Sequence, residues 1–149
     1  SISHDGDVNV ARTWSVTSVP IRSSGFYVNA VLTLAPGVTI SMEPDGYLDV
    51  EDTGSLKATG TSAAPITFTS SKPVKAAGDW YGIDIDGNGC ELSYCVIEYA
   101  DEGLNIERSG ALVLSNSTIS HNAVGIDENG FTYTSTANAI SGNTTDIVP

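Results

Sequence analysis

The chain has 149 residues, of which 6 are basic and 18 are acidic, so its net charge is -12. Such a chain has no cationic surface that could displace counterions from phosphates, which excludes nucleic acid as a partner and disfavours anionic membranes. The length predicts one domain, and no apolar run is long enough for insertion across a membrane.

The N-terminal residues 1–25 follow no repeat. They combine short β-like runs around Val8 and Trp14 with the breakers Pro20 and Gly25. A solenoid needs a cap, because an uncovered end coil exposes backbone groups and apolar core. We therefore interpret residues 1–25 as an irregular N-terminal cap, or as an arm that reaches a neighbouring molecule, and residues 26–149 as the regular domain.

Short strands follow in quick succession after residue 26, separated by turn residues such as Pro36 and Gly37. The predicted strands are 31–34, 38–42, 47–50, 56–58 and 66–69. If one face of successive coils begins at Leu32, Leu56 and Ile83, the steps are 24 and 27 residues. We place the surplus in residues 70–79, which we expect to form a surface loop.

From Gly82 onward, one motif occurs three times and begins a fourth time, at residues 82, 103, 125 and 146. The steps are 21, 22 and 21 residues, and a fixed period of this size is the signature of a solenoid. Each copy holds only short alternating runs broken by Gly, Asn and Ser, which favours strands and tight turns. The residues expected to stack inward in one parallel sheet are Ile83, Leu104, Ile126 and Ile147.

Three blocks of the chain resemble the repeats of right-handed parallel β-helix proteins, namely 32–40, 65–70 and 92–99. This pectate-lyase-like β-helix family occurs among secreted and surface proteins of bacteria and archaea, and the resemblance covers residues 31–149. It implies an all-β, right-handed parallel β-helix solenoid, with about five to six coils at this period. It also implies an extracellular or cell-surface location. It does not select a function, since the family includes enzymes, adhesins and modules without chemistry.

The pattern Asp84-x-Asp86-x-Asn88-Gly matches the opening of a calcium-binding loop, in which oxygen ligands alternate and Gly allows the turn. The twelfth position, where an EF-hand loop has a bidentate Glu, is Cys95. The alternative interpretation is an ordinary Asn-Gly turn. We expect no cofactor, with calcium at Asp84, Asp86 and Asn88 as the one candidate.

Coil stacking should also place Asp84, Asn105 and Asp127 in one outward row. In the pectate-lyase-like enzymes, which the fold resembles, acidic groups on such a face bind calcium or act as acid and base beside a basic residue. Arg108 is the only Arg of the regular part and has no evident partner, so we expect no catalytic site and no enzymatic activity. A separate acidic cluster, around Asp49 and Glu51, is expected to be a solvated face.

Two sequons, at Asn116 and Asn143, are candidate glycosylation sites. We expect Asn143 to be the better acceptor, because Asn116 would be hidden in a ladder of inward Asn side chains. The two cysteines, Cys90 and Cys95, are expected to be free thiols.

These patterns predict a non-catalytic extracellular structural protein: a self-assembling filament subunit, or a stalk or adhesin module of a surface. The expected partners are copies of the chain itself, joined end to end, because the last coil is begun and not closed. The alternative is a module that binds polysaccharide or processes it with the help of calcium.

Overall fold

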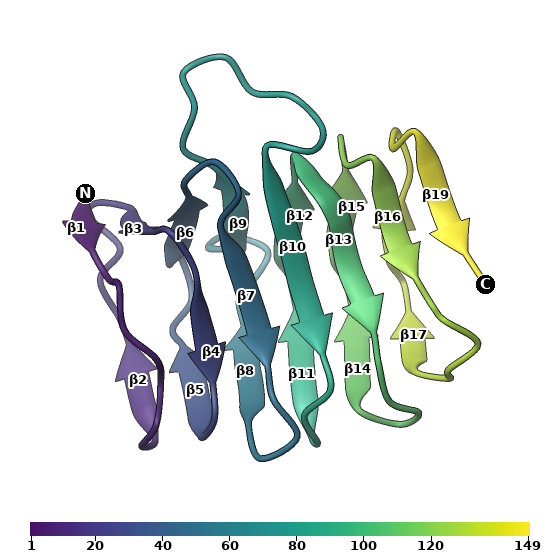
Figure 1. Cartoon of the computed structure of the whole chain (residues 1–149), viewed down its shortest axis with the longest axis horizontal. Coiled ribbons are helices and arrows are strands. Elements are labelled where there is room, and N and C mark those ends of the chain that lie inside the picture. Colours follow the sequence, from purple (N-terminus) through teal and green to yellow (C-terminus); the bar gives the residue numbers. More distant parts are fainter.

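The computed structural model describes residues 1–149 and contains strands only, arranged as a parallel β-helix with three sheets (Figure 1). Sheet A contains β1 (Ile2–Ser3), β3 (Ile21–Ser23), β6 (Thr39–Met42), β9 (Ile66–Ser70), β12 (Cys95–Glu98), β15 (Thr118–Ser120) and β18 (Ala139–Ile140). Sheet B contains β4 (Phe26–Val28), β7 (Tyr47–Val50), β10 (Trp80–Ile85), β13 (Ala100–Ile106), β16 (Val124–Asp127) and β19 (Thr145–Val148). Sheet C contains β2 (Arg12–Trp14), β5 (Val31–Leu34), β8 (Ser55–Thr59), β11 (Cys90–Ser93), β14 (Leu112–Ser115) and β17 (Thr134–Thr136).

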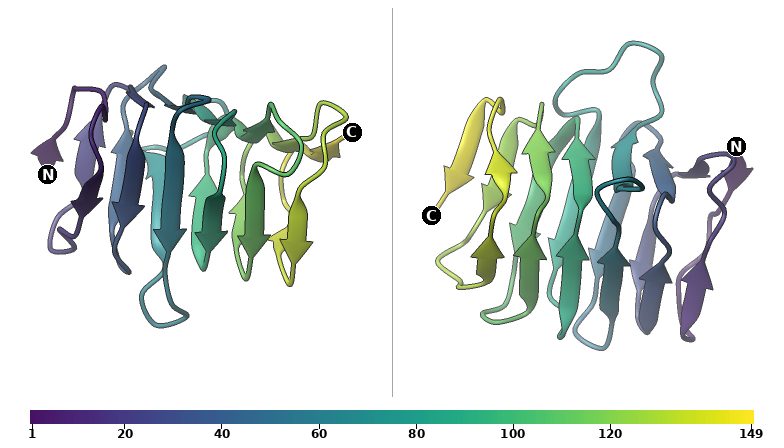
Figure 2. Two further views of the ribbon diagram at one scale, coloured as in Figure 1. Left: turned by 90° about the horizontal axis from the view of Figure 1, so that it is seen from below. Right: turned by 180° about the vertical axis from the view of Figure 1, so that it is seen from behind.

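The chain visits the sheets in the order A, B, C once per coil, and the 7 strands of sheet A mark seven coils. The coils lie side by side along the long axis, with the two termini at opposite ends (Figures 1 and 2). All-β parallel stacking is therefore confirmed. The expected five to six coils were too few, because the N-terminal segment contributes a coil that was not counted.

Residues 1–25 form the first coil of the solenoid, at the end where the sequence predicts a cap or an arm. Ile2 pairs with Ile21 in sheet A, Val8 bridges to Val28, and β2 pairs with β5 in sheet C. The segment neither crosses the first coil nor reaches out as an arm. Only one side of this first coil is covered by another coil, so most of its residues are exposed. The alternation of inward apolar and outward polar residues is therefore weak in its sequence.

The predicted stacking in sheet B is confirmed for its register. Ile83 pairs with Leu104, Leu104 with Ile126, and Ile126 with Ile147. The first three are fully buried, whereas Ile147 in the last coil is 43% exposed. The expected step from Leu56 to Ile83 was wrong, because Ile83 pairs with Leu48 and the strand after Leu56 in sheet C is β11.

The interior is one apolar core of 30 buried residues that runs through the coils. Its largest member, Trp80, is fully buried and donates from Nε1 to the carbonyl oxygen of Glu98 at 2.9 Å. Cys90 and Cys95 are also buried and are free thiols, as predicted. Because burial raises the pKa of both thiols, that of Cys95 to about 12, neither is a reactive thiolate at neutral pH.

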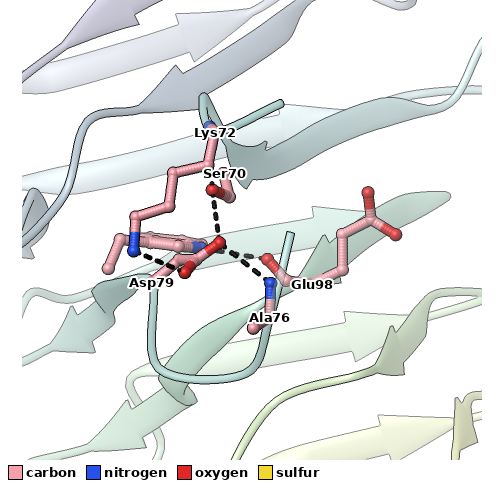
Figure 3. A network of polar contacts seen from close by, with 6 residues as sticks. Ser70, Lys72, Ala76, Asp79 and Glu98 are labelled. Carbon is pink, nitrogen blue, oxygen red and sulfur yellow. Dashed lines mark hydrogen bonds and ion pairs between the residues drawn. The ribbon is translucent and has the colours of Figure 1, made fainter. Parts of the chain in front are cut away.

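The predicted loop before Trp80 is confirmed and leaves the solenoid between β9 and β10 (Figure 1). Figure 3 shows how the buried Asp79 holds its base: the carboxylate accepts hydrogen bonds from Ser70 Oγ at 2.7 Å, Lys72 Nζ at 2.8 Å and the Ala76 amide at 3.0 Å. Burial alone would raise the pKa of Asp79, but these donors outweigh it and lower the pKa. The loop is therefore fastened to the coil at its root.

Candidate functional site

The outer face of sheet B carries a row of polar side chains in register. Asp49 pairs with Asp84, Asp84 with Asn105, and Asn105 with Asp127. Asn105 Nδ2 donates to Asp84 Oδ1 at 3.1 Å, which links two coils directly. The predicted row of Asp84, Asn105 and Asp127 is therefore confirmed. Asp49 belongs to the same row, although the sequence had suggested a separate cluster.

The carboxyl groups of Asp49 and Asp84 are neighbours on this face. Burial, followed by the negative charge of Asp84 and a hydrogen bond with it, raises the pKa of Asp49 from 3.8 to about 7. Glu51 and Glu107 add to the same repulsion. Asp49 is therefore partly protonated near neutral pH.

A second row of acidic residues, which includes Asp86 and Glu107, lies next to the first row at the end of the same strands. Burial and then the charges of Asp84 and Asp86 raise the pKa of Glu107. The sequence suggested that Arg108 has no partner. In the structure its Nε lies 3.1 Å from Asp86 Oδ1. The single guanidinium near these rows is therefore already paired within the protein.

The residues of the predicted calcium loop do not form a cage. Asp84 and Asp86 are outward and half-buried, with partners in the next coil, while Asn88 is exposed in the turn before β11. No group of three or more His, Cys, Asp or Glu side chains is placed so that it could hold a metal ion. Calcium prefers six to eight oxygen ligands. A calcium site at Asp84, Asp86 and Asn88 stays a prediction.

Comparison with protein families gives a match to the pectate-lyase like beta helix domain over residues 23–93. The match begins at β3 and ends at β11, and the same three sheets continue through the rest of the chain. The match and the parallel solenoid together support a β-helix repeat family for the chain. Comparison with curated proteins and with solved structures returns no match. The family resemblance is thus confirmed, while the activity of this β-helix remains to be inferred from its surface.

Of the two sequon residues, Asn116 is the more accessible one, whereas the sequence predicted Asn143. Asn143 is the one in an inward ladder: its Oδ1 accepts from the backbone and side chain of Asn122 at 3.0 Å, and its Nδ2 donates to Ile119 O at 3.0 Å. Asn116 is exposed at a corner with φ of 50°. The sequence could not separate them because both lie in short connections between strands. Asn116 is therefore the more accessible acceptor.

The β-helix has one cavity, and it lies away from the acidic rows. Its volume is about 230 Å³, and Ile2, Trp14, Val16 and Ile21 are among the residues that line it, at the first coil. His4 also lines it, and its buried Nε2 atom has no hydrogen-bond partner. The acidic face of sheet B itself has no pocket to enclose a substrate.

Proposed function

We propose that this β-helix is a non-catalytic structural module of an extracellular or cell-surface protein, serving as a stiff spacer in a stalk, an adhesin or a self-assembling filament. The observation that carries the proposal is the unbroken ladder, in which all three sheets extend from the first coil to the last coils around one core. At about 4.8 Å per coil, such a ladder forms a rod about 30 Å long.

Two features support the absence of catalysis. Stabilising a developing negative charge requires a free cation or a metal beside a base. Arg108 is committed to Asp86, and the carboxylates of sheet B are not enclosed by a pocket that would exclude water.

The Asp49 and Asp84 pair favours a second candidate, a module that binds polysaccharide or processes it with calcium. A carboxyl such as Asp49, whose pKa is raised to about 7 by burial and by a neighbouring carboxyl, is the kind of group that can serve as a general acid or base. We rank it second because the arrangement lacks a free cation.

A cleavage assay separates the two functions. The chain is incubated with acidic and neutral polysaccharides, with calcium or with a chelator, and unsaturated and reducing ends are measured. We expect no release of either. Release that is abolished by Asp84→Ala or Arg108→Ala would replace the structural function with the enzymatic one.

Electron microscopy and light scattering at increasing protein concentration test the self-assembling form. Filaments are expected to lengthen along the axis of the coils. Polysaccharide binding without cleavage would favour an adhesin over a filament.

A further inference from the structure

The outer face of sheet C differs from the acidic outer face of sheet B because its charge is balanced. One ladder of outward positions crosses all six strands: Thr13, Thr33, Lys57, Glu91, Val113 and Thr134. Lys57 Nζ lies 3.5 Å from Glu91 Oε1, so the only two charges of the ladder oppose each other. The net charge of this ladder is zero on a chain whose net charge is -12.

The other outward positions of sheet C are small and uncharged. The second ladder contains Thr59, Ser93, Ser115 and Thr136. Val113 in the first ladder is 46% exposed, and Val31 at the edge is 43% exposed. The loop before Trp80 leaves the protein between sheets A and B and does not cover this face (Figure 1). Sheet C therefore presents an accessible and shallow surface with few long side chains.

The ladder is complementary to itself. Sheet C has six strands, and its midline runs between β8, which carries Lys57, and β11, which carries Glu91 (Figure 2, right). Rotation of a second copy by 180° about an axis parallel to these strands places Glu91 of that copy opposite Lys57, and the reverse. The same rotation places Thr33 opposite Val113, and Thr13 opposite Thr134.

We propose that the outer face of sheet C is a docking surface for a second copy of this chain, in a two-fold dimer with the solenoid axes antiparallel. Charge favours this face over the acidic face of sheet B, and the Lys57 and Glu91 pair at its midline makes it complementary to itself. Two chains that each carry a net charge of -12 repel one another wherever their acidic faces meet, and least where the charges are balanced. On sheet C the Lys57 and Glu91 pairs of two copies form a square of alternating charge.

The area of the face sets the expected affinity. Six strands of about four residues cover roughly 400 Å² on each copy, or roughly 800 Å² in total. This is below the ~1,200 Å² at which stable interfaces begin. The dimer is therefore expected to be weak and concentration-dependent. The proposal does not depend on end-to-end assembly, which uses other surfaces.

Charge reversal tests the proposal. Self-association is measured by sedimentation equilibrium at about 150 mM salt for the unmodified chain, Lys57→Glu and Glu91→Lys. Each single variant places like charges opposite each other at both pairs of the two-fold interface. Each should weaken self-association at least about tenfold.

An equimolar mixture of the two variants should restore self-association. In the mixed dimer, the carboxylate introduced by Lys57→Glu in one chain faces the ammonium introduced by Glu91→Lys in the other. Both chains of that mixture lack the internal ion pair, so only a contact between chains explains the rescue.

The control is the ion pair of Arg22 and Glu43, whose Nε and Oε1 atoms lie 3.0 Å apart with similar exposure outside sheet C. Arg22→Glu should leave self-association unchanged, and circular dichroism confirms that each variant is folded. Small-angle scattering separates a side-by-side dimer, which keeps the length of one rod, from an end-to-end one, which doubles it. A chain that stays monomeric at about 1 mM, or a mixture that does not associate, would overturn the proposal.

Discussion

Sheets B and C are built on the same coils and face the same core, yet their outer surfaces have opposite character. Sheet B aligns Asp49, Asp84 and Asp127 with one paired guanidinium nearby, and repulsion raises the pKa of Asp49 to about 7. Sheet C aligns hydroxyl groups around a single Lys57 and Glu91 pair. Strand pairing determines where each outward side chain lies, but it does not restrict which type of residue stands there. In a β-helix, the outer faces are therefore the surfaces on which function can differ.

The largest effect should come from the core that both faces share. Ile126→Asp buries an unpaired carboxylate under the last coil, because Ile126 is fully buried between Leu104 and Ile147. We expect a loss of about 4 kcal/mol or more, measured by urea unfolding. Ile147→Asp, in the same row but 43% exposed, is the matched control and should cost less than about 1 kcal/mol. Equal losses of stability in the two variants would show that Ile126 is no more buried than Ile147, which would contradict the assigned core.

The next effect should loosen the two strands that flank the loop, β9 of sheet A and β10 of sheet B, and leave sheet C intact. Asp79→Ala removes the carboxylate that accepts from Ser70, Lys72 and the Ala76 amide just before β10. Of the three donors only Ser70 is buried, and a buried donor without a partner costs about 1–3 kcal/mol, whereas Lys72 and the Ala76 amide can turn to water. We therefore expect a total loss of about 2–3 kcal/mol. Hydrogen exchange should accelerate in β9 and β10 before β8 and β11. Asp101→Ala, at an exposed carboxylate, should not change the exchange of these strands.

The pH dependence of stability should depend on sheet B. The pKa of Asp49 is about 7 in the folded chain and 3.8 in the unfolded one, so protonation favours folding. This contribution is complete below about pH 4 and is lost as the pH rises through about 7. Asp49→Asn should therefore stabilise the chain at pH 8 by about 1 kcal/mol, after allowance for screening, and by almost nothing at pH 4. A larger gain at pH 4 than at pH 8 would contradict the assigned direction.

The smallest effect on stability is expected on sheet C. Lys57→Glu breaks a pair whose side chains are 34% and 54% exposed, and such pairs contribute less than about 1 kcal/mol. Thermal unfolding at low protein concentration should therefore be nearly unchanged, although self-association falls. A fall in both would mean that Lys57 supports the coil itself.

The sequence predicted the regular half of the fold because strict period and inward alternation act together there. The register of Ile83, Leu104 and Ile126 could be read directly from the repeat. The first coil was missed because its residues are covered on one side only, which removes the alternation. The sequence also did not predict that Asp49 lies beside Asp84 in one row. The loop between β9 and β10 lengthens the step between these two neighbours to 35 residues.

Disulfide trapping between β7 and β10, the two neighbouring strands that this long step separates in the sequence, tests the account most directly. Asp49 and Asp84 are neighbours on adjacent strands, whereas Asp49 and Asn105 lie two strands apart, at about 10 Å. A disulfide needs Cα atoms within about 7 Å. Under mild oxidation, the variant with Asp49→Cys and Asp84→Cys should form an intramolecular disulfide, detected by peptide mass spectrometry. The variant with Asp49→Cys and Asn105→Cys should not, and a bond there, or none in the first variant, would contradict the coil register on which both faces rest.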